Sequence, residues 1–152
     1  MVAMSTAEFL QFSLRSKAEF AKQHQEDTGD SLPASLEKAD AEFDKHLPQG
    51  QGTAGHYFYH LKNEAGLGCG YLWYGLSQSA STQKIFIFDI LIELPFRGKG
   101  FSKFMLQWLE TETKALGLNE ISLHVLGYNN VARNLYDSMG FEVTNVYMSK
   151  KI

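Results

Sequence analysis

A short turn with two glycines and several cations is the first candidate for chemistry. The stretch RGKGFSK, residues 97–103, follows an apolar run and opens an amphipathic one. If the second run is a helix, its first amides lack intrahelical partners and its N-terminus carries about half a positive charge. Gly98 and Gly100 would let the backbone approach an anion closely. Three cations surround them: Arg97, Lys99 and Lys103. The turn predicts a phosphate or pyrophosphate site.

Two familiar phosphate motifs do not fit this turn. A P-loop needs a lysine followed at once by Ser or Thr, whereas Lys99 precedes Gly100 and Lys103 precedes Phe104. A dinucleotide fingerprint needs a third glycine where Lys103 stands. A tight turn with solvated basic neighbours would look the same, so the anion site needs support from a second motif.

The second motif lies in NNVARNLYDSMG, residues 129–140, which begins with asparagine and ends with glycine as a helix does. A phenol with an ordinary pKa near 10 is protonated at neutral pH, so Tyr136 could act as a general acid. The alternative is that Tyr136 packs beside Ala132 on the same helix face. Asn129 could cap the helix, bind a ligand, or do both.

The elements that must position these residues follow from periodicity. Ser5 and Glu8 form a capping-box pattern ahead of a helix whose apolar residues are Phe9, Leu10, Leu14 and Phe20. A second helix, with Leu36, Ala39, Phe43 and Leu47 on one side, should stop at Pro48. Strands are predicted over residues 56–63, 67–76, 84–94, 120–126 and 141–151, and further helices over 101–116 and 129–140. This order predicts a mixed α/β fold whose first strands pair antiparallel.

The whole chain limits the classes of function. Its 152 residues suit one domain, and a net charge of −3 gives no general attraction to nucleic acid or anionic membrane. No segment reaches the length of a membrane span and no leader pattern opens the chain, which favours a cytoplasmic protein. Cys69 cannot form an internal disulfide, and its apolar surroundings predict a buried thiol.

Together these motifs resemble the GCN5-related N-acetyltransferase (GNAT) family. The family pattern Q/R-x-x-G-x-G/A is matched by Arg97, Gly100 and Ser102, with serine replacing the last small residue. A second block is matched by Asn129, Ala132 and Tyr136, followed by Gly140-Phe141. The resemblance is close over residues 84–141 and implies one N-acetyltransferase domain over 1–152. Residues 1–50 would form a helical, variable acceptor side and residues 56–152 the sheet and cofactor part.

The resemblance also assigns cofactor roles. The fourth and fifth strands, parallel and splayed, would admit acetyl-CoA as cosubstrate without a metal. The backbone of Ile90, Leu91 and Ile92 would pair with the pantetheine arm as another strand does. Asn129 would hydrogen-bond the cofactor. The pyrophosphate would lie on the turn, held by Arg97, Gly98, Lys99, Gly100, Phe101, Ser102 and Lys103.

The acceptor amine arrives protonated and needs a base. In some relatives an acid occupies the position of His124, which strand alternation places opposite Ile121 and Leu123. Asp89, inside an apolar run, and Glu93 are further candidates, and a water relay is a fourth. Other relatives place their acid where this chain has Phe86, a departure that leaves the base open.

The sequence therefore predicts direct transfer of acetyl to a primary amine in a ternary complex, with Tyr136 and His124 as catalytic residues. The acceptor would be a small-molecule or peptide amine, and a homodimer stays open. The alternatives are a non-catalytic acyl-CoA-binding sensor module and a nucleotide-binding protein that uses the same turn.

Overall fold

The computed structural model describes residues 1–79, 82–150 and 152. A five-stranded sheet runs in the order β1-β2-β3-β4-β5, antiparallel except for the parallel pair β4–β5. Its strands are β1 (Val2–Ala3), β2 (His56–Lys62), β3 (Gly68–Ser79), β4 (Thr82–Ile92) and β5 (Ile121–Leu123). The expected mixed sheet, antiparallel first and parallel at β4–β5, is confirmed.

The helices form where apolar periodicity and capping residues predict them, except that the first helix continues to Thr28, through polar residues 24–28 that the sequence suggests as a break. They are α1 (Thr6–Thr28), α2 (Leu32–His46), α3 (Phe101–Ala115) and α4 (Asn130–Ser138), with short 3₁₀ turns at Gly50–Gly52 and Leu94–Phe96. Ser5 and Glu8 form both hydrogen bonds of the capping box, which satisfies amides at the start of α1. The α2 helix ends at His46, just before Pro48, as predicted.

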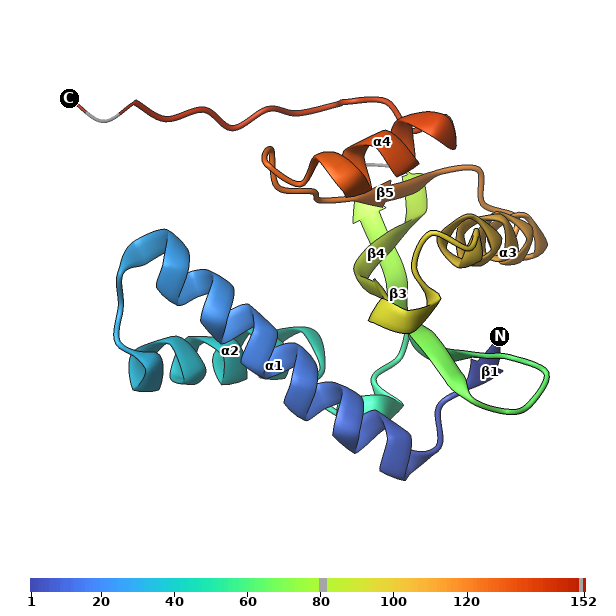
Figure 1. The fold of residues 1–152 in the computed structure, drawn as a ribbon, viewed down its shortest axis with the longest axis horizontal. Coiled ribbons are helices and arrows are strands. Elements are labelled where there is room, and N and C mark those ends of the chain that lie inside the picture. The colour runs from blue at the N-terminus through green and yellow to red at the C-terminus, as the bar shows by residue number, and fades with distance from the viewer. Residues whose placement is uncertain (80–81, 151) are drawn as a thin grey trace.

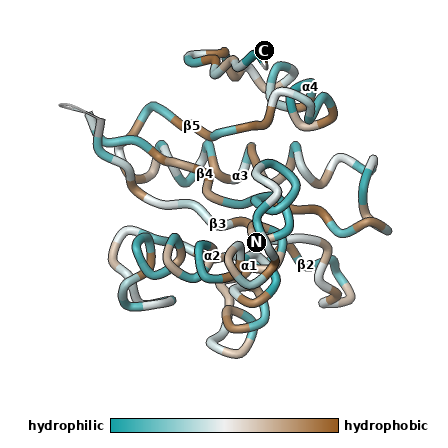
Figure 2. Tube along the Cα trace, turned by 90° about the vertical axis from the view of Figure 1, so that its left-hand side faces the viewer, coloured by the Kyte–Doolittle hydropathy of each residue, from teal (hydrophilic) through white to brown (hydrophobic). Residues whose placement is uncertain are grey.

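Two apolar clusters cover the two faces of the sheet (Figures 1 and 2). On one face α3 packs Met105, Leu106 and Leu109 against the strands. On the other face lie α1 and α2, which contribute aromatic residues such as Phe12 and Phe43. Alternate strand residues therefore point to opposite helical layers, which is why β3 reads as a nearly continuous apolar run.

A β-bulge interrupts this alternation in β4. Trp73 pairs with Asp89 but the next residue, Tyr74, pairs with Ile87, so Phe88 is the extra residue. Ile87 belongs to the cluster on the α3 side, whereas Phe88 packs against the cluster on the α1 side. Because of the bulge, the neighbouring Asp89 also turns its carboxylate toward α1.

The predicted last strand is wrong. Residues 141–150 form neither strand nor helix, and the tail leads from α4 away from the molecule (Figure 1); residue 151 lies outside the described residues. Aromatic and β-branched side chains favour a strand, but a strand exists only when its backbone pairs with a neighbour. In this chain the segment has none among the described residues.

Candidate active site

The two parallel strands diverge and leave a cavity between them. They pair only as far as Ile87 and Leu123, after which β4 continues to Ile92 paired with β3 but without β5. The cavity that opens there has a volume of about 200 Å³. Its walls are β4, the segment after β5 and α4, and the residues that line it are Ile87, Phe88, Asp89, Ile90, Leu123, His124, Val125, Leu126, Asn129, Ala132 and Tyr136. The cavity thus brings together Ile90, His124, Asn129 and Tyr136, all of which the sequence singled out.

The backbone of β4 beside this cavity has one free edge. Ile90, Leu91 and Ile92 pair with Leu72, Tyr71 and Gly70 of β3. On the opposite side β5 has ended, so no strand of the described chain continues the ladder there. Backbone groups in this position can accept an extended, amide-containing chain as an additional strand.

The glycine turn presents a run of free amides. Gly98 and Gly100 have φ angles of 71° and 83°, which glycine adopts readily. Gly100 caps α3 without any side-chain hydrogen bond. From Gly98 to Lys103, no backbone amide has a hydrogen-bond partner within the described chain; the ladder starts with Phe104 N donating to Gly100 O. Six consecutive free amides at a helix N-terminus form a strong site for an anion.

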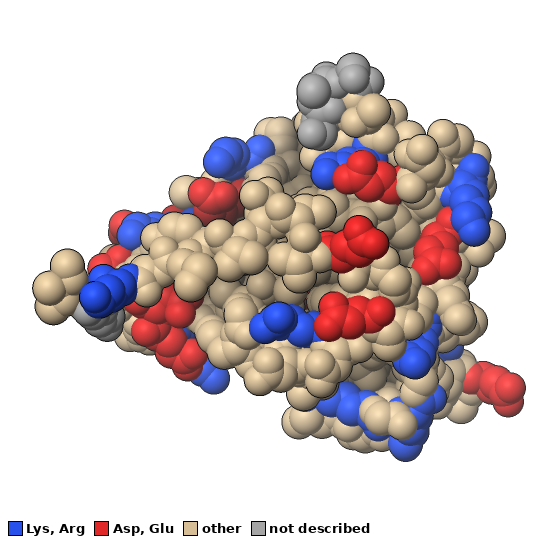
Figure 3. Space-filling view, turned by 90° about the horizontal axis from the view of Figure 1, so that it is seen from above, with Lys and Arg blue, Asp and Glu red and all other residues tan. Residues whose placement is uncertain are grey.

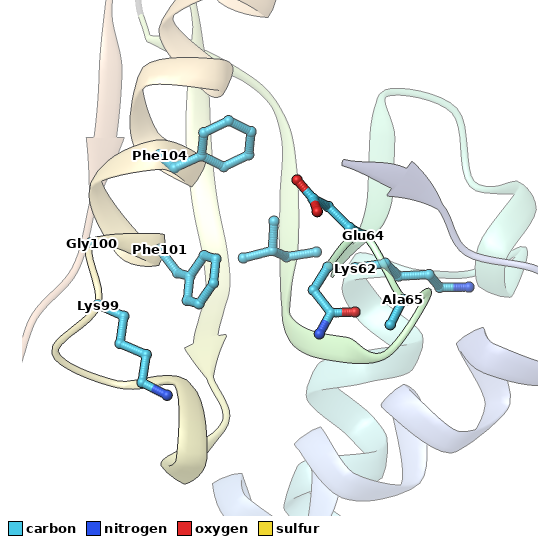
Figure 4. Close-up of a pocket in the computed structure, with 9 residues that line it drawn as sticks. Lys62, Glu64, Ala65, Lys99, Gly100, Phe101 and Phe104 are labelled. Carbon is cyan, nitrogen blue, oxygen red and sulfur yellow. The ribbon is translucent and has the colours of Figure 1, made fainter.

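Two of the nearby cations also hold the loop itself. Arg97 Nε donates to Ile92 O at 2.9 Å, and Lys99 Nζ donates to Pro95 O at the same distance. Lys99 and Phe101 also border a larger, open cavity beside the turn between β2 and β3 (Figure 4). In that view Phe101 and Phe104 project from α3 toward Glu64 and Ala65. Charge and apolar surface therefore lie side by side where α3 begins.

Tyr136 is the buried residue of α4, and it lines the cavity. Burial, followed by the negative charge of Asp89, raises the pKa of the phenol above its ordinary value. The group therefore stays protonated across the neutral range. No hydrogen bond within the described chain engages its hydroxyl, which leaves this donor available to a ligand. Asn129, about two turns earlier, accepts a hydrogen bond from Ala132 N and so caps α4.

Asp89 has the most elaborate environment of the candidate bases. Its Oδ2 accepts hydrogen bonds from Ser16 Oγ at 2.7 Å and Tyr71 Oη at 3.2 Å. Burial raises the pKa of this carboxyl, while the two hydroxyls and the nearby Arg15 counteract part of that rise. The result is a carboxylate on the cavity wall with an increased affinity for protons.

The other candidate bases lie in more open positions. His124 follows the end of β5, is exposed, and borders the cavity. Glu93, just after β4, forms an ion pair with Arg15 of α1. Its carboxylate is therefore engaged by the helical layer, and it is not among the residues that line the cavity.

Sequence reasoning missed the partners that α1 provides. Ser16 and Arg15 lie 73 and 78 residues before the acids they contact, and no local pattern links such distant positions. The bulge at Phe88 was also missed, because a single extra residue does not alter the apolar composition of the strand. An acid inside an apolar run was the one usable signal, and it did mark Asp89.

Comparison with known proteins decides the family. The model of the Acetyltransferase (GNAT) family matches residues 18–141. This chain belongs to the GNAT family. The acetyltransferase is 31% identical over 149 residues to YdgE of Bacillus subtilis strain 168, named an uncharacterized N-acetyltransferase, and the match covers 98% of this chain and 95% of YdgE. It is 33% identical over 154 residues to YycN of the same strain, which bears the same description, with 100% and 97% covered.

Solved structures agree with the fold of the acetyltransferase. The crystal structure of YycN superposes with a TM-score of 0.87 over 99% of this chain and 96% of that one. AAC(6')-Iy, solved with the bisubstrate analogue CoA-S-monomethyl-acetylneamine, shares the fold at 14% identity, with a TM-score of 0.64 and coverage of 99% and 95%.

The described part of the acetyltransferase has neither a metal-binding cluster nor a membrane-spanning helix. Within residues 1–79, 82–150 and 152, no group of three or more His, Cys, Asp or Glu side chains could hold a metal ion. Across the same residues no helix combines the length and apolar character that a bilayer crossing needs.

Proposed function

We propose that this acetyltransferase moves an acetyl group from acetyl-CoA to a primary amine by direct attack in a ternary complex. The observation that carries the proposal is the cavity between β4 and β5. Tyr136, which is protonated, and Asp89, which has a raised pKa, both line it. GNAT enzymes use acetyl-CoA, and both curated relatives are named N-acetyltransferases.

The cofactor-binding part of the proposal rests on unsatisfied backbone groups. The six amides from Gly98 to Lys103 provide donors for a diphosphate, and the free edge of β4 at Ile90 to Ile92 provides a ladder for pantetheine. Ile92 O already accepts from Arg97 Nε, and the other open groups of both features need a ligand or water, since backbone groups are rarely left without a partner. Asn129, just before α4, lines the cavity between β4 and β5.

The chemical step needs one proton donor and one proton acceptor. Bound acetyl-CoA supplies a thioester whose carbonyl carbon the amine nitrogen attacks, so that the C–S bond breaks and coenzyme A leaves as a thiolate. Tyr136 donates its proton toward that sulfur, because a phenol with a raised pKa is protonated throughout the working range. Before the attack, Asp89 accepts one proton from the acceptor's ammonium, because it lines the cavity and binds protons more readily than an ordinary carboxylate. After the attack, the nitrogen loses its second proton to the phenolate of Tyr136, directly or through water, which restores the phenol.

The acceptor would approach from the helical layer of α1 and α2. Ser16 and Arg15 of α1 contact Asp89 and Glu93 there, so this layer forms the surroundings of the proposed base. A primary amine carries a positive charge, which suits a wall that includes carboxylates. The structural neighbours that bear aminoglycoside 6'-N-acetyltransferase names favour a small-molecule amine over a protein acceptor.

Two measurements test the function. Titration calorimetry with acetyl-CoA should show saturable binding with a stoichiometry of one per chain, and no binding at micromolar protein would remove the proposal. Mass spectrometry of a panel of primary amines, incubated with acetyl-CoA and enzyme, should then detect acetylated product. Saturable binding without turnover on any amine would favour the alternative of an acyl-CoA sensor.

A further inference from the structure

One side of α1 contacts both the carboxylate of Asp89 and the tyrosine next to it. Phe12 and Ser16 are four residues apart, so they project to the same side of the helix, and both are buried. The ring of Phe12 meets the ring of Tyr71 edge-on, with 5.0 Å between the centroids. Ser16 Oγ donates to Asp89 Oδ2 at 2.7 Å. The helix thus holds a tyrosine of β3 and an acid of β4 at one place.

Both hydroxyls donate to the same oxygen of the carboxylate. Tyr71 Oη donates to Asp89 Oδ2 at 3.2 Å, beside the shorter bond from Ser16 Oγ. Oδ1 accepts from no side chain within the described residues, and the amide of Ile90 adds a weak backbone hydrogen bond to the carboxylate. Because Oδ2 already accepts two hydrogen bonds, Oδ1 is the oxygen with free capacity for a proton.

The two donors keep their protons where the carboxyl of Asp89 titrates. Tyr71 is only 4% exposed, and burial, followed by the charge of Asp89, raises the pKa of its phenol. The hydroxyl of Ser16 does not ionise in water. Tyr71 is also held in place, since the guanidinium carbon of Arg15 lies 5.7 Å from the centroid of its ring. Both hydrogen bonds to Oδ2 therefore persist across the acidic and neutral range.

We propose that Ser16 and Tyr71 are positioning residues, whose hydrogen bonds to Oδ2 fix the carboxylate of Asp89 so that Oδ1 receives the proton of the acceptor's ammonium. This inference rests on the proposed function, because it requires Asp89 to be the base. Neither hydroxyl gives up its own proton. Because Ser16 belongs to the helical layer of α1 and α2, the base is complete only when α1 lies on the sheet.

The titratable groups around Asp89 come from several elements. Arg15 of α1 favours its ionised form, as does the hydrogen bond from Tyr71 of β3. Tyr136 of α4 is affected by its charge, and His124 lines the same cavity. Figure 3 shows charges of both signs interspersed on the face seen from above, without an extended patch of one sign among the described residues that it draws. Such mixed, exposed charges are largely screened by salt, so the local contacts dominate.

The pH dependence of kcat/KM for the full chain gives the first test. Each hydrogen bond favours the ionised carboxylate, so its loss raises the pKa of Asp89. In Ser16→Ala and in Tyr71→Phe, the fall of kcat/KM on the acidic side should therefore move to higher pH. The plateau should also decrease by about tenfold or more, because the carboxylate loses its fixed orientation. Unchanged profiles in both variants would overturn the proposal.

Two matched controls separate positioning from the mere loss of a buried hydroxyl. Ser35 of α2 is fully buried, and its Oγ lies 3.3 Å from His24 Nδ1. Tyr74 of β3 is also buried, but it belongs to the cluster on the α3 side of the sheet. Ser35→Ala and Tyr74→Phe should keep the wild-type profile. An equal shift in these controls would attribute the effect to lost packing and contradict the proposal.

A titration that needs no turnover distinguishes this inference from the proposed function. The ¹³C resonance of the Asp89 carboxyl, assigned by its absence in Asp89→Asn, should titrate at higher pH in Ser16→Ala and in Tyr71→Phe than in the wild type. An unmoved titration together with normal turnover would overturn the inference and leave the proposed function intact. A moved titration in a protein that acetylates no amine would instead remove the proposed function, and with it the role of Asp89 as base.

Discussion

At the scale of single residues, the surroundings of the cavity raise the pKa values of Tyr136 and Asp89. The shift suits Tyr136 to donate a proton and Asp89 to accept one. Tyr136 keeps its proton because burial and the charge of Asp89 both oppose a phenolate. Asp89 gains proton affinity chiefly from burial, even though Ser16 and Tyr71 donate hydrogen bonds to it. A neighbouring donor and acceptor with displaced pKa values are the arrangement that acid–base chemistry requires.

Replacing Tyr136 by Phe should separate chemistry from binding. The variant keeps the ring that packs against Phe141 and loses only the hydroxyl, so the fold should be retained. We expect kcat to fall by roughly 10²–10⁴-fold, the usual contribution of a general acid, with little change in the affinity for acetyl-CoA. Steady-state kinetics and calorimetry on the same preparation measure both. Unchanged turnover at every pH would remove the acid role.

Asp89→Asn tests the base and also changes how stability depends on pH. The carboxyl has a folded pKa above its ordinary 3.8, so the folded chain holds the proton where the unfolded chain has lost it. The contribution of Asp89 to wild-type stability should therefore fall as pH rises from 3.8 through the folded pKa, and this contribution should be absent in Asp89→Asn. Denaturant unfolding at a series of pH values measures the difference.

The same variant should reduce kcat/KM by about 10²-fold or more, because the proton acceptor is lost. In the wild type, kcat/KM should fall on the acidic side of its pH profile with an apparent pKa above 3.8. Glu93→Gln, which removes the acid paired with Arg15 outside the cavity, is the control and should keep the profile. If His124→Asn rather than Asp89→Asn abolished that limb, the sequence-based choice of His124 as base would be preferred.

At the scale of elements, the start of α3 depends on a conformation that other residues resist. Gly100 has φ of 83°, and a Cβ there would meet no atom within 4 Å, so backbone strain is the main penalty for Ala. Gly100→Ala should cost about 1–2 kcal/mol of stability and weaken the binding of coenzyme A by about tenfold or more as the free amides shift. Thermal unfolding and calorimetry measure the two effects.

A second glycine provides the control for this variant. Gly29 caps the end of α1 with a φ of 78°, and a Cβ there would also meet no atom within 4 Å. It is far in sequence from the residues that line the cavity. Gly29→Ala should carry a comparable strain but leave the affinity for coenzyme A unchanged. Equal losses of affinity in the two variants would indicate a general effect of destabilisation, not a role of the α3 turn.

The elements also show what the sequence could and could not predict. The start of α1 followed from a local signal, Ser5 with Glu8, because capping is decided within a few residues. The buried face of α1 did not follow: Leu10 and Leu14 are exposed, whereas Phe12 and Ser16 turn inward. An apolar period identifies a helix, but its orientation is set by the sheet it meets.

For the strands, too, the sequence predicted some features and missed others. β2, β3 and β4 were predictable from composition, because they pair with one another and stay buried. β5 was expected to continue to residue 126 but ends at Leu123, since its neighbour β4 diverges there. Of the predicted site residues, Ile90, His124, Asn129 and Tyr136 meet at the cavity as a consequence of this divergence, which no local pattern encodes.

At the scale of the whole molecule, the cavity joins parts of the chain that are otherwise in separate layers. β4 lies between β3 and β5 in the sheet, α4 carries Tyr136, and Ser16 of α1 donates a hydrogen bond to Asp89. A ligand that bridges β4, the α3 turn and α4 would bind the folded chain only. Binding should therefore stabilise the entire fold by linkage.

Coenzyme A should raise the melting temperature for this reason. At a concentration 100 times the dissociation constant, linkage adds about 2.7 kcal/mol, which corresponds to a shift of roughly 5–10 °C for a chain of this size. Differential scanning fluorimetry with and without coenzyme A measures it, and ATP at the same concentration is the comparison. An equal shift with ATP would favour a nucleotide-binding protein over a coenzyme A enzyme.

The burial of Cys69 has a practical consequence for enzymology. This thiol is fully enclosed, and its Sγ donates to Leu67 O. A colorimetric reagent that reads free sulfhydryls should therefore see the coenzyme A released in each catalytic cycle, with almost no background from the folded enzyme. A slow rise in that background would then report unfolding of the sample during the assay.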